Sequence, residues 1–156
     1  MPEDGFDGAK LTPAPASPGV ASALRTIERE QAGLALLAES LKGTLGAGFD
    51  NAATLIGSVR GRVIVTGIGK SGHIARKIAA TLASTGTLAF FIHAAEAGHG
   101  GLGMVSPDDV VLALSWSGES AELRTIVEYV RRYGVPLIAI TSVSDSALGR
   151  AADVVL

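Results

Sequence analysis

The chain has 156 residues, of which 47% are hydrophobic and 18% charged, and its formal net charge is −2. This composition predicts one globular domain with a sizeable core, and the scattered basic residues argue against a nucleic-acid partner. The absence of cysteine excludes disulfides and thiolate chemistry, and no apolar run approaches the roughly 20 residues of a membrane span. No export signal is visible, so we expect a soluble cytoplasmic protein.

The N-terminal part of the sequence divides into a tail and helices. Residues 1–18 mix proline, alanine, glycine and charges without periodicity, which predicts a disordered tail. From 20 to about 45, apolar residues at 24, 27, 34, 37 and 41 fall on one face of a helix. A second short helix is expected over 50–59.

Strands and helices then alternate. Buried strands are expected over 62–67, 88–92, 109–115, 136–141 and 153–156, with helices over 71–86, 119–133 and 145–152. This pattern predicts an α/β domain over 19–156, a doubly wound five-stranded parallel sheet preceded by N-terminal helices. Because no helix follows the last strand, we expect an uncovered sheet face there, and marginal stability or obligate association.

The loop GIGKSGH, residues 67–73, joins the first strand to a helix, at the strand ends where open parallel sheets bind ligands. Its glycines match the G-x-G-x-x-G fingerprint, but the next strand ends in His93 instead of the acidic residue of a dinucleotide site. A Walker A motif fails because Ile64 occupies the position of its first glycine. What remains is a generic anion site with Lys70 and Ser71, or a tight turn with a solvated lysine.

The segment SWSGES, residues 115–120, lies between the third strand and the helix that follows it. Its hydroxyl residues are Ser115, Ser117 and Ser120. Hydroxyls and free N–H groups at a helix N-terminus suit a phosphate of about two negative charges. Simple helix capping is the alternative, but one serine satisfies a cap and three exceed that need. Glu119 and Glu122 are each either a partner of the helix dipole or a catalytic group.

The segment HAAEAGHGGLG, residues 93–103, is expected to be a glycine-rich loop. Its His93, Glu96 and His99 are residue types that bind zinc, but their spacing does not place all three on one helical face. Metal coordination, contact with a substrate and ordinary hydrogen bonding therefore remain open for these side chains.

Together, VTGIGKSGHIARKIAATLASTGT, HAAEAGHGGLGMV and SWSGESAE resemble the sugar isomerase (SIS) domain. They are most similar to the D-arabinose 5-phosphate isomerases, which interconvert that aldose with D-ribulose 5-phosphate, and the likeness runs over about 20–156. The resemblance implies a flavodoxin-like fold, an enediol mechanism without a required cofactor and a tetrameric homo-oligomer. It also implies a place in the lipopolysaccharide sugar pathway.

The same resemblance implies roles for particular residues. The phosphate would be held by Ser71, Ser115, Ser117 and Ser120, and the sugar site would be lined by Gly86, His93 and His99. Lys70 would stabilise the enediolate, and Glu122 would relay protons or position Lys70. His93 meets zinc in some family members, which implies a zinc contact here. The segment 125–134 would contribute to the site of the same or a neighbouring subunit.

The sequence also departs from the family. Trp116 stands where the family often has asparagine, and Gly101 where it often has aspartate. The family pattern continues past the fifth strand with the expected enolisation base, a glutamate, then a histidine and often CBS domains. We therefore expect this chain to hold the front part of the domain without that base. The alternatives are a non-catalytic phosphosugar-binding sensor module and, on the glycine fingerprint alone, a nucleotide-dependent dehydrogenase.

Overall fold

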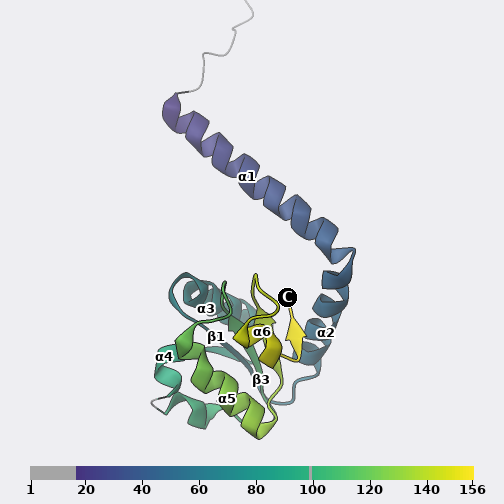
Figure 1. Cartoon of the computed structure of the whole chain (residues 1–156), viewed down its shortest axis with the longest axis vertical. Helices are drawn as coiled ribbons and strands as arrows, with labels where there is room; N and C mark the ends of the chain where they lie inside the picture. The colour runs from purple at the N-terminus through teal and green to yellow at the C-terminus, as the bar shows by residue number, and fades with distance from the viewer. Residues whose placement is uncertain (1–16, 99) are drawn as a thin grey trace, which may run out of the picture. The chain divides into compact units, whose positions relative to one another are not determined.

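The computed structural model describes residues 17–98 and 100–156 (Figure 1). The predicted disordered tail lies outside the described residues except for its last two, and Pro18 begins a helix. The chain forms two compact units, Met1–Glu39 and Ser40–Leu156. Helix α1, Pro18–Leu41, provides the described part of the first unit and contains no buried residue. In the described ranges, no helix is long and apolar enough to cross a membrane.

The first helix that lies wholly in the second unit starts earlier than the sequence predicts. The expected helix over 20–45 ends at Leu41, and α2, Thr44–Ser58, begins after Gly43 instead of at residue 50. A β-carbon at Gly46 would overlap the carbonyl oxygen of Leu41, so the connection between the two helices requires glycine there. The glycine-rich segment 43–48 therefore marks the helix boundary that apolar periodicity alone did not locate.

The described part of the second unit contains the predicted parallel sheet. Its five strands are β1 (Val63–Gly67), β2 (Ala89–His93), β3 (Val110–Leu114), β4 (Leu137–Ile140) and β5 (Val154–Val155). They pair in parallel in the order β2-β1-β3-β4-β5, which is the flavodoxin-like order. Every residue of β1 and β3 is buried, because these strands lie inside the sheet and are covered on both faces.

Helices cover both faces of the sheet (Figure 1). Besides α2, they are α3 (Gly69–Ser84), α4 (Ala94–Ala97), α5 (Arg124–Tyr133) and α6 (Ala147–Ala151), with 3₁₀ turns η1 (Gly101–Met104) and η2 (Ala121–Leu123). On one face, Ala52 of α2 and Ala75 of α3 pack in a cluster with Val65. On the other, Ala97, Ile126 and Leu148, from α4, α5 and α6, pack in a cluster with Ile64. Small residues on α2 and α3 bring these helices close to the sheet.

The expectation that the last strand lacks a covering helix is wrong. Val154 of β5 is buried in the same apolar cluster as Ala52 of α2. A β-carbon at Gly48 would stand 3.1 Å from the carbonyl oxygen of Val155, so α2 approaches β5 closely. The covering helix precedes the sheet in the sequence, and this is why inspection of the residues after the strand did not reveal it.

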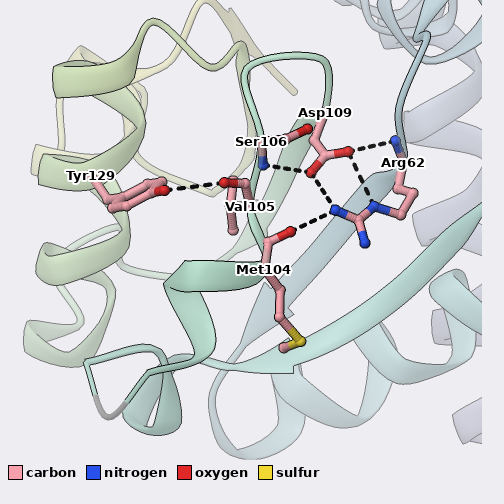
Figure 2. A network of polar contacts seen from close by, with 6 residues as sticks. All are labelled: Arg62, Met104, Val105, Ser106, Asp109 and Tyr129. Carbon is pink, nitrogen blue, oxygen red and sulfur yellow. Dashed lines mark hydrogen bonds and ion pairs between the residues drawn. The ribbon is translucent and has the colours of Figure 1, made fainter.

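A partly buried ion pair joins the segments that lead into β1 and β3 (Figure 2). The carboxylate of Asp109 accepts hydrogen bonds from the backbone N–H of Arg62 at 2.7 Å, from its guanidinium at 3.1 Å and from the N–H of Ser106 at 2.8 Å. Burial alone would raise the pKa of Asp109, but the hydrogen bonds from Arg62 and Ser106 and the charge of Arg62 outweigh this effect. The pKa of Asp109 therefore lies below its ordinary value of 3.8.

The same pair holds the segment that closes the histidine-containing connection. Arg62 Nη2 donates to the carbonyl oxygen of Met104 at 2.6 Å, and Tyr129 Oη donates to that of Val105 at 3.1 Å (Figure 2). Two backbone carbonyls, one at the end of η1 and one directly after it, thus have partners on the segment leading into β1 and on α5. This network lies where strands begin, at the opposite edge of the sheet from the loops singled out by the sequence.

Candidate functional site

The loops after β1, β2 and β3 leave the sheet at one edge. In the parallel register, Gly67, the last residue of β1, lies beside His93 of β2 and beside Leu114 of β3. After β2 the chain crosses back over β1 to form β3, so the strand order reverses between β1 and β3. Open α/β sheets bind their ligands in the crevice at this point. The fold therefore brings together the start of GIGKSGH, the start of the histidine-containing connection and the segment SWSGES.

The glycines of GIGKSGH serve close packing at this edge. A β-carbon at Gly67 would lie 3.0 Å from the carbonyl oxygen of Leu114, and one at Gly72 would lie 2.9 Å from that of Gly67. Gly69 has a φ of +55°, in the left-handed region that favours glycine. Close packing of the helix on the strands, together with the left-handed turn at Gly69, therefore explains the glycines of the G-x-G-x-x-G pattern. The N-cap residue of α3, Ile68, provides no side-chain cap, so the first N–H groups of α3 remain for an anion.

A cavity of about 540 Å³ opens at the same edge. It is lined by Lys70, Ser71, Ile74, Leu114, Ser115, Trp116, Ile140, Thr141, Ser142 and Leu156. Lys70 carries the one ionisable side chain among these lining residues. The cavity therefore combines one cationic side chain and several hydroxyl groups with an apolar wall, a composition that suits a small ligand with an anionic end and a carbon chain.

The serines after β3 form a compact hydrogen-bonded loop. Ser115 is buried, its Oγ accepts from the N–H of Gly118 at 3.1 Å, and the Oγ atoms of Ser115 and Ser120 share a hydrogen bond at 2.9 Å. Ser117 is exposed, and its Oγ accepts from the N–H of Glu119 at 3.3 Å. In the described part of the chain, the N–H groups of Ser117 and Ser120 donate to no backbone carbonyl. Donors for a phosphate are thus present on this loop.

The helix predicted from Glu119 begins later. The turn η2 follows the serines, and α5 starts only at Arg124. Gly118 adopts a φ of +66°, and a β-carbon there would overlap Ser146 Oγ, so the chain turns sharply before any helix starts. The hydroxyl and N–H groups that could bind a phosphate here therefore belong to a loop and a 3₁₀ turn, and not to the first turn of an α-helix. Helix α5 itself buries Ile126 and Val130, and its residues do not line the cavity.

The connection between β4 and α6 holds this loop in place. The carbonyl oxygen of Trp116 accepts from the N–H of Ser142 at 3.0 Å and from its Oγ at 2.6 Å. The carbonyl oxygen of Gly118 accepts from the N–H of Leu148 at 3.0 Å. Thr141 and Ser142 also line the cavity, and sequence reasoning missed both. The signal was available, because they follow the apolar run LIAI and so stand at the carboxyl end of a strand.

Glu119 and Glu122, for each of which the sequence left a structural or a catalytic role open, have different surroundings in the structure. Glu119 Oε1 accepts from the N–H of Ala147 at 2.7 Å, at the start of α6, where Ser146 Oγ also accepts from Gly149 at 3.2 Å. Glu119 therefore stabilises the first turn of α6. Glu122 is exposed in η2, and no hydrogen bond or ion pair is found for its side chain within the described ranges. Glu122 keeps a free carboxylate near the serines.

The remaining predicted residues are placed differently. His93 ends β2 beside Gly67, and its Nδ1 accepts from the N–H of Ala95 at 3.3 Å. His99 lies outside the described residues. Gly86, with a φ of +96°, follows α3 at the opposite edge of the sheet, where it lines a hollow with Arg60. The structure therefore does not bring Gly86 to the other predicted site residues that it describes.

The zinc contact of His93 stays a prediction. Within residues 17–98 and 100–156, no cluster of three or more metal-binding side chains is found. The predicted loop that carries His93 and His99 contains a short helix, α4, and the turn η1. His93 is the N-cap of α4, which gives this side chain a structural hydrogen bond in addition to any role with a ligand.

Relatives of known name share much of this chain. Arabinose 5-phosphate isomerase KdsD of Pseudomonas aeruginosa is 50% identical over 133 residues, which are 85% of this chain and 40% of the relative. KdsD of Escherichia coli K12 is 58% identical over 95 residues, 61% of this chain and 29% of the relative. This chain thus spans 40% or less of the length of these relatives.

Solved structures share its fold. An Escherichia coli CFT073 protein in complex with arabinose 5-phosphate is 40% identical, with a TM-score of 0.75 over 86% of this chain and 72% of that one. The sugar isomerase domain of an RpiR transcription factor from Sphaerobacter thermophilus has a TM-score of 0.71 over 84% of this chain and 73% of that one. At 23% identity it shows the fold alone. The SIS domain family matches residues 56–156, more than half of the sequence, and the chain therefore belongs to the SIS domain family.

Proposed function

We propose that this chain forms the phosphosugar-binding part of an aldose–ketose isomerase that interconverts D-arabinose 5-phosphate and D-ribulose 5-phosphate. The observation that carries this proposal is one cavity, at the β1–β3 switch point, that joins Lys70 with the hydroxyl residues Ser71 and Ser115. The identity to the KdsD enzymes supports the reaction, and the similar structure in complex with arabinose 5-phosphate supports the ligand.

The phosphate group would bind where the serine loop meets the start of α3. Ser115 and Ser120 share a hydrogen bond that uses the hydrogen of one hydroxyl, so the hydrogen of the accepting hydroxyl can turn toward a bound oxyanion. The N–H groups of Ser117 and Ser120 and the uncapped start of α3 add backbone donors. Lys70 supplies the positive charge of the lining, which offsets part of the phosphate charge.

The sugar chemistry would use the same lysine. Isomerisation moves one proton between C2 and C1 through an enediol, while a second proton moves between the two oxygens. Lys70 would stabilise the negative charge that develops on oxygen in the enediolate. Glu122, the carboxylate of this region without a structural hydrogen bond in the described ranges, would relay protons to the substrate. Neither role requires a redox cofactor.

A second candidate function is phosphosugar binding without catalysis, as in a sensor module. The observation that favours it is the composition of the cavity wall, in which the described lining residues include no carboxylate side chain. Proton abstraction from carbon needs a base within hydrogen-bond reach of the substrate, whereas phosphate binding does not. The described wall thus supports binding more directly than it supports proton transfer.

A proton NMR time course of D-arabinose 5-phosphate in heavy water with this chain separates the two candidates. For the isomerase we expect loss of the C2 proton signal and growth of D-ribulose 5-phosphate, because the enediol exchanges its proton with solvent. Broadened sugar signals without turnover would support the binding module. Unchanged spectra would contradict both.

Two variants make the result specific to this site. Ser115→Ala removes the hydroxyl that links Gly118 and Ser120, so sugar-phosphate binding should weaken by about tenfold or more. Lys70→Met should lower turnover by about 100-fold or more, with a smaller loss of binding. Lys77→Met on the same helix is the matched control, because Lys77 does not line the cavity and should leave binding and turnover unchanged.

A further inference from the structure

The single tryptophan of the sequence stands at the mouth of this cavity. Trp116 is 81% exposed, more than any other large hydrophobic residue in the described ranges, and it lines the cavity with Ile74 and Leu156. Isolated apolar residues on a surface need no explanation. Trp116 differs from them because it lies between Ser115 and Ser117 of the proposed phosphate loop and forms part of a concave wall.

The backbone of Trp116 is fixed while its indole stays largely exposed. Its carbonyl oxygen accepts two hydrogen bonds from Ser142 and one from Thr141 Oγ1 at 3.3 Å. The preceding residue, Ser115, is buried. A large side chain on a fixed backbone is therefore held at the cavity without being buried by the described part of the chain. Such a side chain contributes contact area to a ligand at a low cost in conformational entropy.

The chemistry of a sugar phosphate matches this position. Trp116 lines the same cavity as Ser115 and Lys70, so a carbon chain attached to a phosphate on these residues would lie in a cavity that the indole helps to wall. The face of an aromatic ring carries partial negative charge, and the C–H groups of a sugar chain carry partial positive charge and apolar surface. Covering that chain would also exclude water from the carbons at which the enediol forms.

We infer that Trp116 determines specificity in this cavity, with its indole covering the carbon chain of a bound sugar phosphate. This inference rests on the proposed function and adds a residue that distinguishes a sugar phosphate from phosphate alone. Inorganic phosphate would use the serine loop and Lys70, and it would leave the indole in water. A sugar phosphate would use the same anion site and also bury the indole.

Because Trp116 is the only tryptophan, its fluorescence reports on this contact directly. We expect a saturable blue shift of tryptophan emission with D-arabinose 5-phosphate and a much smaller change with inorganic phosphate, each bound in parallel calorimetric titrations. Trp116→Ala should weaken binding of D-arabinose 5-phosphate by about tenfold, from lost apolar burial, and change binding of inorganic phosphate by less than about twofold. Trp116→Phe should retain most of the affinity.

Leu88→Ala is the matched control, since Leu88 is 70% exposed but lies with Gly86 at the opposite edge of the sheet. It should change neither titration. Equal affinity of the wild type and Trp116→Ala for the sugar phosphate, with unchanged emission, would overturn the inference and leave the proposed function standing. Emission that changes with protein concentration alone would place the indole against a second copy and overturn it also. Absence of binding for both ligands would refute the proposed function itself.

Discussion

Arg62 and Asp109 form an ion pair at 3.1 Å across the two central strands, each residue standing immediately before its strand. The carboxylate of Asp109 is fully buried, while the side chain of Arg62 remains 40% exposed. The same carboxylate accepts backbone N–H groups from both segments. The pair therefore fixes the register in which β1 and β3 begin. The same register sets how the loops that follow the two strands lie beside each other.

Replacement of Asp109 should reduce stability strongly. Asp109→Ala leaves two N–H groups and a guanidinium without their acceptor, and we expect a loss of about 2–4 kcal/mol in the free energy of unfolding. Urea denaturation measures this loss. The neighbouring Asp108 offers a matched control, because it pairs with Arg60 on the surface, where both side chains are more than half exposed. Asp108→Ala should cost less than about 1 kcal/mol. Equal losses would contradict the structural role of Asp109.

The stability should also depend on pH through Asp109. Its pKa is lower in the folded chain than its ordinary value of 3.8, so its contribution is present above that value and is lost as pH falls through the folded pKa. Urea denaturation of wild type and Asp109→Asn across acidic pH tests this. The stability difference should be constant in the neutral range and shrink below about pH 4. A difference that grows on acidification would contradict the assignment.

The five strands could be predicted because β1 and β3 consist of continuous apolar residues, a pattern that buried parallel strands require. The start of α5 could not be predicted from the sequence, because Glu119 and Ser120 are residue types that are common at the start of a helix. In the fold, Gly118 packs on Ser146 and delays the helix to Arg124. That contact joins residues distant in sequence, which local periodicity does not contain.

The candidate site shows the same division. Lys70, Ser71 and Ser115 were found because polar residues after apolar strands mark the binding edge of a sheet, and all three line the cavity. Thr141 and Ser142 obey the same rule and were overlooked. Gly86 was predicted for the sugar site through the family resemblance alone, and the fold places it at the edge of the sheet opposite the cavity. Whether His99 belongs to the site stays a prediction.

A side chain at Gly118 should disrupt the serine loop. Gly118→Ala would require an unfavourable φ of +66° and would overlap Ser146 Oγ, so we expect a loss of about 2–4 kcal/mol in unfolding free energy and at least tenfold weaker phosphate binding. Gly57→Ala is the matched control. Gly57 lies in α2 with open space at its β-carbon, and alanine there should stabilise the chain by about 0.5–1 kcal/mol. Thermal denaturation and phosphate titration report both effects, and unaltered phosphate affinity in Gly118→Ala would count against the loop as the anion site.

Replacement of Glu119 should lower stability, whereas replacement of Glu122 should slow isomerisation. Glu119→Ala removes the acceptor for Ala147 and should cost about 1 kcal/mol of stability. Glu122→Ala should change stability by less than about 0.5 kcal/mol, because Glu122 is exposed and has no hydrogen bond in the described part of the chain, yet it should slow isomerisation. Denaturation curves and the heavy-water exchange assay on both variants decide this. Full exchange activity in Glu122→Ala would remove Glu122 from the mechanism.

The serine loop is tied along its length to the segment 141–148, at Trp116, Gly118 and Glu119. A loop ordered in this way loses little chain entropy when an anion arrives, because that ordering accompanies folding of the domain. Ligand affinity therefore depends in part on residues outside the cavity wall. Sequence drift at Ala147 and Leu148, which do not line the cavity, would change the affinity of the site without altering a group of the cavity wall, and natural selection on affinity would act on those residues as well.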